Sequence, residues 1–346
     1  MLSLAESVTT KHELPSIVGS PGATVRRQGN GTTLLYFLDS GASAENITSV
    51  PTAGRVLIGT SDGLHLKPLI TGQRYPDGVA VSLAEGKLFW SNMGDAGASD
   101  GAIFSSTVDG NAVKTIVPQG VINTPKQITI DHQNSKLYIA DREGMRIFRC
   151  NFDGSDLEVL IQSGSLEKEN EKNDKTRWCV GIAVSPRTGK IYWTQKGPSK
   201  GFQGQLFRAN MEFPPGQQAG TRDDIELLLE NLPEPINLDI DEANNTIYWT
   251  DRGELPLGNT INRVSLDKVE PIRERNASSI PWLEGKYEIL VRNLHEAIGI
   301  KLDLNNRHIY ATDLGGGVYR FDMNGENKKK LYEDGSAYTG ITIASI

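Results

Sequence analysis

Polar, aromatic and titratable residues recur just before short apolar runs along this chain of 346 residues. The residues in this first set are Tyr75, Asp77, Lys126, Gln127, Trp178, Asn237, His295, Glu296, Tyr338 and Thr339. A second set, which follows aromatic-rich runs, consists of Asn92, Arg142 and Gln195, with Lys196 and Arg252 at the position of Arg142 in later runs. Together these side chains offer hydrogen-bond donors, acceptors and aromatic faces, a combination that binds a mid-sized organic ligand when it converges on one site.

Three of these residues are the candidates for catalysis. His295 is suited to proton transfer, because imidazole titrates near neutral pH and Glu296 lies beside it in the chain. Lys126 can polarise a carbonyl oxygen, and Tyr75 can form a wall of the site. The alternative roles are structural: a hydrogen-bonded histidine that supports the fold, and a lysine that offsets nearby carboxylates.

The other candidates are assigned to substrate binding, and several have a structural alternative. Trp178 either stacks on a ligand or fills space in the interior. Asn92 and Gln195 stand where equivalent segments have a carboxylate, which indicates either a relaxed structural requirement or a site that excludes negative charge. The aspartates at that position, such as Asp141 and Asp251, are expected to support the neighbouring repeat by hydrogen bonds.

Composition and motifs argue against several classes of function. The formal net charge is −7, the pI is near 5.4 and no extended basic run occurs, so nucleic acid is not expected as a partner. No nucleophile elbow, zinc-ligand cluster, phosphate loop or dinucleotide fingerprint occurs in the right context, so neither a metal nor a cofactor is expected. Asp77, Asn237 and Glu296 are too few and too scattered to predict a calcium site. Cys150 and Cys179 form no disulfide framework.

An aromatic-rich segment recurs six times at intervals of 49 to 62 residues. The recurrences begin at Tyr36, Phe89, Tyr138, Tyr192, Tyr248 and Tyr310. Each is flanked by apolar or alternating runs, with turns such as Asp153-Gly154 between them, which are strand and hairpin signals. The spacing is typical of one four-stranded blade with its loops, so the sequence predicts an all-β, six-bladed β-propeller with antiparallel blades.

The two ends of the chain are expected to share one blade. Residues 338–343 have the pattern of a first strand with nothing after it, and residues 34–37 that of a second strand with no first strand before it. Their pairing would close the ring and remove exposed sheet edges. The predicted domains are an N-terminal extension over 1–31 and a single propeller over 32–346. In such a ring both polar sets lie on one face, at one mouth of the central channel.

Across about residues 32–346 the chain resembles the YWTD propellers of the low-density-lipoprotein-receptor type. The full motif stands once, at Tyr248-Trp249-Thr250-Asp251, and the six-fold recurrence carries the resemblance. More narrowly, the chain is similar to the stand-alone, soluble YWTD-like propellers of fungal biosynthetic pathways. Some of those proteins act as hetero-Diels–Alderases on tropolone and sesquiterpene partners.

The narrower resemblance implies a cofactor-independent enzyme of secondary metabolism that joins a polyene to a tropolone-like partner in the channel mouth. His295 would supply the acid for dehydration to a quinone methide, and Lys126, Gln127 or Asn237 would donate hydrogen bonds to the heterodiene. Two alternatives stay open. One is a calcium-dependent lactonase or related hydrolase, and the other is a non-catalytic propeller that binds a protein or a ligand.

The sequence also carries expectations about the state of the protein. Glu6 interrupts the apolar run that a secretory signal would need, and no stretch reaches the length of a membrane span, so a cytoplasmic protein is expected. We expect a monomer. Residues 162–177 form a charged insertion that leads into Trp178, either as a lid over the channel or as a surface loop.

Overall fold

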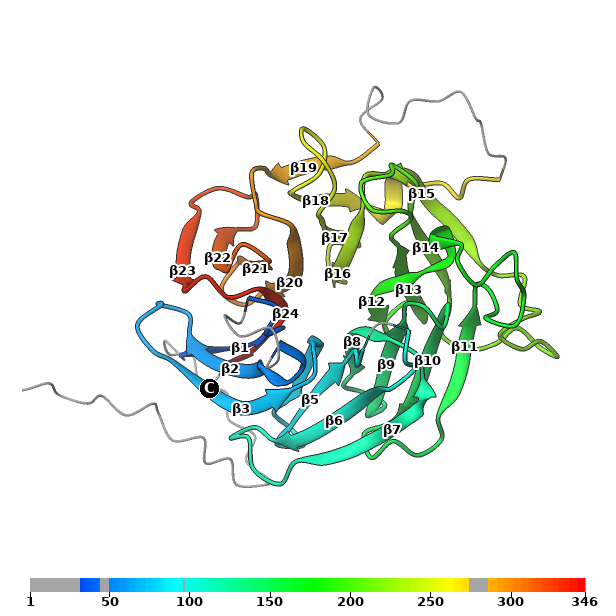
Figure 1. The fold of residues 1–346 in the computed structure, drawn as a ribbon. Helices are drawn as coiled ribbons and strands as arrows, with labels where there is room; N and C mark the ends of the chain where they lie inside the picture. Colours follow the sequence, from blue (N-terminus) through cyan, green and yellow to red (C-terminus); the bar gives the residue numbers. More distant parts are fainter. Residues whose placement is uncertain (1–31, 44–49, 96, 274–285, 346) are drawn as a thin grey trace, which may run out of the picture.

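The computed structural model describes residues 32–43, 50–95, 97–273 and 286–345. These residues form six four-stranded antiparallel sheets, arranged as blades around a central axis (Figure 1). The prediction of a six-bladed β-propeller is confirmed. The predicted N-terminal extension, residues 1–31, lies outside the described residues. No helix in the described ranges is both long and apolar enough to cross a membrane.

The first three blades along the chain follow one another in sequence, and in each of them the chain runs from the strand nearest the axis to the outermost strand. Blade 1 contains β4 (Pro76–Ser82), β5 (Lys87–Asn92), β6 (Gly101–Thr107) and β7 (Lys114–Ile122). Blade 2 contains β8 (Pro125–Asp131), β9 (Lys136–Asp141), β10 (Arg146–Asn151) and β11 (Glu158–Gln162). Blade 3 contains β12 (Cys179–Ser185), β13 (Lys190–Gln195), β14 (Gly204–Asn210) and β15 (Glu226–Leu232).

The remaining blades complete the ring. Blade 4 contains β16 (Pro235–Asp241), β17 (Thr246–Asp251), β18 (Thr260–Ser265) and β19 (Glu288–Val291). Blade 5 contains β20 (Ala297–Asp303), β21 (His308–Asp313), β22 (Gly317–Asp322) and β23 (Lys329–Glu333). Blade 6 contains β24 (Tyr338–Ser345), β1 (Thr33–Asp39), β2 (Gly54–Thr60) and β3 (Leu66–Gln73). The described residues also form three short 3-10 helices, η1 (Val50–Thr52), η2 (Lys175–Arg177) and η3 (Leu266–Lys268).

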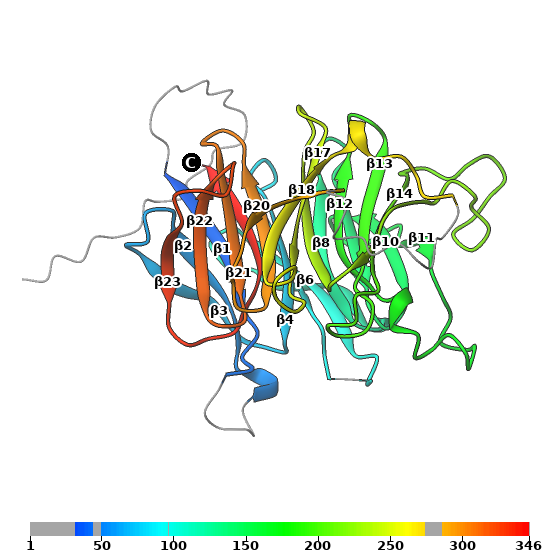
Figure 2. The ribbon, with the colours of Figure 1, turned by 90° about the horizontal axis from the view of Figure 1, so that it is seen from above.

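Blade 6 combines both ends of the chain, as predicted. The C-terminal strand β24 is innermost and pairs antiparallel with β1, so that Tyr36 lies opposite Thr342. Figure 1 shows these two strands side by side, and Figure 2 shows the same ring of blades from above. The pairing closes the ring, so the array of blades has no open end at which another chain could add a strand.

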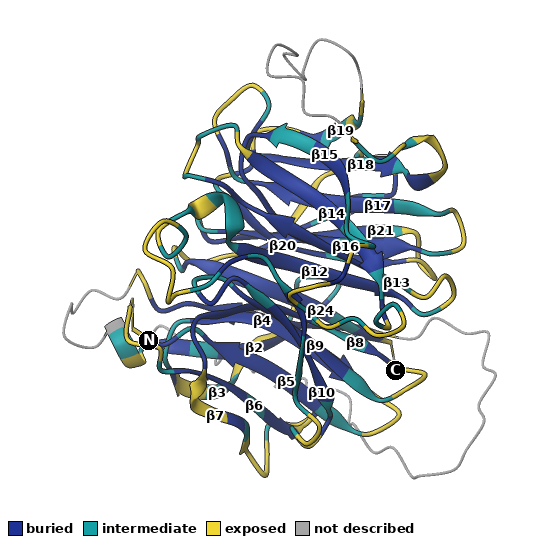
Figure 3. Ribbon diagram, turned by 90° about the vertical axis from the view of Figure 1, so that its right-hand side faces the viewer, coloured by how far each residue is buried: buried dark blue, intermediate teal, exposed yellow. Residues whose placement is uncertain are grey.

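The hydrophobic core lies between neighbouring blades. The innermost and second strands are buried along nearly their whole length, whereas the turns are exposed (Figure 3). Trp90, Trp193 and Trp249 of the second strands are fully buried, and Trp193 packs in one cluster with residues of blade 2. Because neighbouring blades cover both faces of each second strand, the middle of these strands is apolar almost continuously rather than alternating.

A hydroxyl in the second strand links each of four blades to the next. Thr250 accepts the N–H of Asn237 in its own blade and donates to the carbonyl of Ile298 in blade 5. The same position carries Ser91, Thr194 and Thr312, each with the same pair of bonds. Leu38 and Ala140 occupy it in the other two blades and have no hydroxyl. The third residue of the repeat therefore holds blades together.

The aspartates that end the second strands act differently from the prediction. Asp141, Asp251 and Asp313 each accept backbone N–H groups from the loop that enters their own blade, for example the N–H of Thr124. The expectation that they support the neighbouring blade was wrong. The reason is register: each aspartate lies opposite the first residue of its own innermost strand, beside that strand's entry loop.

Candidate functional site

Two rings of residues surround one mouth of the central channel. The second residue of each innermost strand forms what we call the floor ring: Asp77, Lys126, Val180, Ile236, Ile298 and Thr339. The residue after each second strand forms the rim ring: Ser40, Met93, Arg142, Lys196, Arg252 and Leu314. In all six blades the backbone N–H of the rim residue donates to the carbonyl of the residue that precedes the innermost strand. This hydrogen bond, repeated in all six blades, places the residues that enter the innermost strands beside those that leave the second strands, at one mouth of the channel.

The floor ring is divided into a polar arc and an apolar arc. Val180, Ile236 and Ile298, from three consecutive blades, form a buried hydrophobic cluster against which Leu314 of the rim packs. The other half of the ring is polar, with Asp77, Lys126 and Thr339 from blades 1, 2 and 6. A ligand that rests on this floor meets hydrocarbon on one side and hydrogen-bonding groups on the other.

The polar arc is centred on a buried ion pair. Lys126 Nζ lies 2.5 Å from Asp77 Oδ1, and the side chains of the lysine and the aspartate are 11% and 1% exposed. Gln127 completes the pair, because its Nε2 donates to both Asp77 Oδ2 and the Asp77 carbonyl at 2.8 and 2.9 Å. A hydroxyl in the second strand of blade 6 would bond to the carbonyl of Asp77, but Leu38 occupies that position. The Gln127 amide makes this hydrogen bond instead.

Lys126 has a pKa suited to proton chemistry near neutral pH. Burial is the main cause that lowers its pKa from 10.5 to about 8, while Asp77 opposes this and the cations Arg142 and Arg252 add to it. The ammonium also lies 3.1 Å from the sulfur of Met93. At pH 7 the group is a desolvated donor that can approach a carbonyl oxygen at the floor.

The rim carries a cationic arc beside Trp178. The side chains of Arg142 and Lys196 lie 5.4 and 5.7 Å from the centre of the Trp178 ring. Lys196 and Arg252 both bind Glu234, a fully buried carboxylate that directly precedes β16. Trp178 therefore packs against cations, which leaves less of its ring for the stacking considered from the sequence.

One member of this arc, Glu234, was not predicted, whereas Lys196 and Arg252 were named from the sequence as residues beside the aromatic-rich runs. Lys196 and Arg252 follow their second strands directly, at the same repeat position as the predicted Arg142. Glu234 stands between Pro233 and Pro235, at the repeat position that Trp178 occupies one blade earlier. The signal was therefore the repeat alignment itself, extended by one residue on either side of the strands.

The rest of the predicted catalytic set lies at the edge of this mouth. His295 is exposed on the loop that enters blade 5, and its backbone N–H donates to Asp313. Glu296 is half-buried, with its carboxylate 3.7 Å from Lys200 Nζ. Tyr75 is half-buried with a positive φ of 51°, and its carbonyl accepts the N–H of Met93. These residues share the face but are not bonded to Lys126.

Other predicted binding residues point elsewhere. The Tyr338 hydroxyl donates to Asp334 on the loop that enters blade 6. Asn92 donates to Gln73, while its own Oδ1 is buried without a hydrogen-bond partner in the described structure. The Thr339 hydroxyl donates to the carbonyl of Pro76, across the boundary to blade 1. The remaining two are Gln195, which is buried opposite Cys179, and Asn237, whose Oδ1 accepts the N–H of Leu238.

The inserted segment over 162–177 is held beside the mouth. It ends in η2, whose N-cap Asp174 accepts the N–H of Thr176, and Lys175 places its Nζ 5.6 Å from the centre of the Trp178 ring. The hydroxyl of Ser163 donates to the carbonyl of Arg177, which joins the two ends of the segment.

A cavity of about 270 Å³ occupies the channel beyond the floor ring. Its walls include aliphatic residues of the innermost strands, among them Ile128, Ile182 and Ile300, as well as polar residues of the same strands. Its far end is lined by His132 and by other residues of the turns that follow these strands, on the face opposite the rim. Asn237 is the predicted site residue that lines it.

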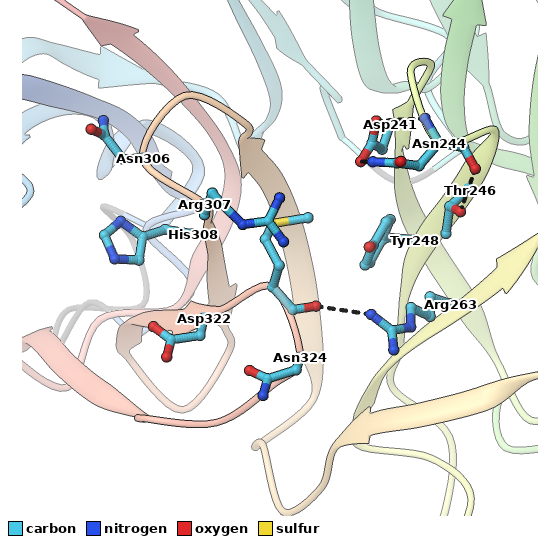
Figure 4. Close-up of a pocket in the computed structure, with 11 residues that line it drawn as sticks. Asp241, Asn244, Thr246, Tyr248, Arg263, Asn306, Arg307, His308, Asp322 and Asn324 are labelled. Atoms are coloured by element: carbon cyan, nitrogen blue, oxygen red, sulfur yellow. Dashed lines mark hydrogen bonds between the residues drawn. The ribbon is translucent and has the colours of Figure 1, made fainter.

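A second hollow lies between blades 4 and 5 on that opposite face. Figure 4 shows the polar and charged side chains that line this space of about 770 Å³, including Arg263, which donates to the carbonyl of Met323. Arg307 and His308 line it from blade 5. None of the predicted site residues lines this groove.

Carboxylates and histidines in the described ranges do not gather into a group of three that could hold a metal ion. Of the residues weighed for calcium, Asp77 is bound to Lys126 and Glu296 lies beside Lys200. The geometry offers more to an organic ligand than to a cation.

Comparison with known proteins supports the fold and identifies relatives. No protein-family model matches the chain. A protein of Cochliobolus heterostrophus named 3-hydroxyacyl-CoA dehydrogenase-like protein LAM1 is 45% identical over 311 residues, which are 90% of this chain and 64% of that protein. This chain therefore spans less than two thirds of the length of that relative. A protein of Pyricularia oryzae named low-density lipoprotein receptor-related protein 1 is 41% identical over 314 residues, 89% of this chain and 97% of that protein.

Solved structures agree on the architecture. A chain from a nidogen/laminin complex aligns with a TM-score of 0.62 and 17% identity over 90% of this chain and 98% of that one. TolB from Acinetobacter baumannii aligns with a TM-score of 0.60 and 12% identity over 90% of this chain and 66% of that one. At such identities the likeness extends to the fold alone. The similarity over nearly the full length of the Pyricularia protein shows more: this chain belongs to the same family of six-bladed β-propellers as that protein.

Proposed function

We propose that the protein is a cofactor-independent enzyme that joins two unsaturated small molecules by a hetero-Diels–Alder type cycloaddition at the rim and floor rings. The observation that carries the proposal is the buried ammonium of Lys126 at the border between the polar arc and the apolar arc. The choice of reaction rests on the resemblance to the fungal propeller enzymes.

The reaction needs orientation and polarisation rather than a nucleophile. A heterodiene with a C=C–C=O unit adds to an alkene, so that one C–C and one C–O bond form and no atom is lost. A hydrogen bond from Lys126 to the heterodiene oxygen withdraws electron density and favours the addition. The hydrocarbon partner would lie on Val180, Ile236 and Ile298, which holds the two reactants together in a water-poor place.

An acid is needed only if the heterodiene is made in place by loss of water from an alcohol. His295 is exposed at the rim of blade 5 and is the group proposed to give the proton to the leaving hydroxyl. Water leaves, the ring hydroxyl of the precursor gives its proton back to the His295 imidazole, and the neutral quinone methide that remains is the heterodiene. This assignment separates the dehydration from the cycloaddition and makes each testable.

The test is incubation of the purified protein with a hydroxymethyl-tropolone and a sesquiterpene polyene, followed by mass analysis and chiral chromatography. The expected product has the summed mass of both partners less one water, in one stereochemical form. A heat-denatured sample gives the uncatalysed background. Equal rate and equal stereochemical composition in both samples would overturn the proposal.

A second candidate function is binding without catalysis, and the channel cavity favours it. At about 270 Å³ it lies near the lower end of the range for small-molecule sites, and aliphatic residues of the innermost strands line it together with polar residues such as Asp239 and Lys301. The test is titration with a small hydrocarbon such as limonene, followed by NMR. The substitution Ile300→Phe would narrow the cavity and is expected to weaken binding there without changing the rim.

A further inference from the structure

Three consecutive blades place a cation at the same position of the rim ring. Arg142, Lys196 and Arg252 follow β9, β13 and β17, and the backbone N–H of each donates to the residue before its own innermost strand. The three side chains are therefore at one level around the mouth. Lys126 of the floor ring lies one layer deeper, below the same arc.

These cations act on one another. Arg142 and Arg252 both contribute to the lowered pKa of Lys126, after burial, and both also help to lower the pKa of Lys196, where burial is again the main cause. Coulombic repulsion of this kind falls off with distance, so these charges lie near one another. The protein as a whole carries a net charge of −7, yet cations gather at this mouth.

The carboxylates near the arc do not use all of its donors. Glu143 binds Arg142 through Nε and Nη2, and Glu234 binds Arg252 through the same two nitrogens. A guanidinium has five N–H groups, so each arginine keeps donors for another acceptor. With Asp77 on Lys126, these carboxylates number three against the four cations of the arc and the floor. The side chains of Arg142 and Arg252 are 22% and 24% exposed, so a ligand can reach them.

The arc also lies next to hydrocarbon. Ile236 of the floor belongs to the same blade as Arg252, and Leu314 of the rim follows Arg252 in the next blade. An acceptor group bound at the arc would therefore have the rest of its molecule directed onto the apolar side. This arrangement fits an amphiphilic organic anion better than a free inorganic ion.

We propose that Arg142, Lys196 and Arg252 form a subsite for the anionic group of an organic ligand, a carboxylate or an enolate oxygen, whose hydrocarbon part lies on the apolar arc. That this ligand is a substrate rests on the proposed function, whereas anion binding itself does not. The site selects planar oxyanions because guanidinium groups pair with two oxygens at once.

The test is isothermal titration with benzoate in a buffer low in chloride, beside the neutral benzyl alcohol. Benzoate is expected to bind with 1:1 stoichiometry and more tightly than the alcohol. Arg142→Gln is expected to weaken benzoate binding about tenfold, the loss of one charge-assisted bond. Arg252→Lys keeps a positive charge beside the buried Glu234 and is expected to weaken benzoate binding less than Arg142→Gln does.

Lys136→Gln provides the matched control. It removes the same charge at the start of β9, on the opposite face, where Lys136 binds Asn151. Benzoate affinity in this variant should equal that of the parent protein. An equal loss in Lys136→Gln and Arg142→Gln, or equal affinity for benzoate and benzyl alcohol, would overturn the subsite. Melting curves of all variants identify any that fail to fold. In that event, competition of sulfate with benzoate for the parent protein tests whether benzoate binds at an anion site.

The two proposals fail separately. Selective benzoate binding without any cycloaddition would keep the anion subsite and remove the proposed reaction. Cycloaddition without selective benzoate binding would keep the reaction and remove the subsite.

Discussion

The Lys126 ammonium lies 2.5 Å from the carboxylate of Asp77, across the boundary between blades 2 and 1. The two residues are 49 positions apart in sequence, close to one repeat, and both belong to the floor ring. The pair is buried, so solvent screens its charges only weakly. The same lysine therefore matters both for the stability of the fold and for the proposed reaction.

Replacement of Lys126 by methionine should abolish most catalysis and weaken the fold. Loss of the donor is expected to lower turnover about 100-fold or more. The uncompensated Asp77 should also destabilise the protein by about 3 to 5 kcal/mol, less what Gln127 recovers. Product formation and urea unfolding measure the two effects. The double variant Lys126→Met/Asp77→Asn should recover much of the stability but none of the activity, and recovered activity would remove Lys126 from the mechanism.

Product formation should fall as the pH rises through about 8, where Lys126 loses its proton. The charged form is the donor, so activity is present below this pKa and is lost above it. Lys126→Arg, which remains charged, should keep whatever activity it has to higher pH. A rate profile from pH 6 to about 10 with a preformed heterodiene makes the measurement, and identical profiles for both proteins would contradict the assignment.

His295→Ala should separate the two chemical steps. The side chain is exposed, so the fold is expected to stay intact. Formation of product from the alcohol precursor should slow about 100-fold, as expected for loss of an acid, whereas addition of a preformed quinone methide should be unchanged. Single-turnover assays with both substrates give the comparison. A similar loss with both would mean that His295 has no specific role in dehydration.

Asp251 should make the protein less stable as the pH rises from about 4 to 7. Burial raises the pKa of this carboxyl from 3.8 to about 7, although the N–H groups of Gly253 and Glu234 oppose the shift. Between these two values the folded state binds more protons than the unfolded state, so the free energy of unfolding decreases with pH. Urea unfolding of the parent protein and of Asp251→Asn at pH 4.5, 5.5, 6.5 and 7.5 checks this. The difference between the two should shift in favour of the variant as the pH rises, and a constant difference would refute the prediction.

Thr250→Val should destabilise the contact between blades 4 and 5. It leaves the carbonyl of Ile298 and the N–H of Asn237 buried without this hydroxyl, at a cost of about 1 to 3 kcal/mol. Thr246→Val, four residues earlier in the same strand and partly exposed, is the control and should change stability by less than about 0.5 kcal/mol. Denaturant unfolding of both variants measures the difference, and equal values would show that the hydroxyl link contributes little.

The repeat pattern made the fold predictable in detail. Six aromatic-rich segments gave six blades, and the unmatched strands over 338–343 and 34–37 gave the shared blade that β24 and β1 form. The same alignment placed Lys126 and Asp77 on one face, because strand register follows from the period of the repeat. The candidate site could be located to one mouth of the channel for this reason.

Side-chain partners at that mouth were less predictable. Sequence placed Tyr338 and His295 beside Lys126 as part of one site, whereas in the structure Tyr338 bonds to Asp334 and His295 lies exposed at the edge. The bond from Gln127 to Asp77 and the shared partner Glu234 of Lys196 and Arg252 were not predicted. These contacts depend on rotamers and on which neighbouring groups are already satisfied.

The amino-acid sequence by itself determined the number of blades, their order and the residues that each presents at every level of the ring, because these follow from local periodicity. Only the tertiary structure decided that the floor divides into an ionic half and an aliphatic half, and that the channel cavity lies beyond it. Those features arise where separate blades meet, so they depend on distances between residues about fifty positions apart that no local pattern encodes.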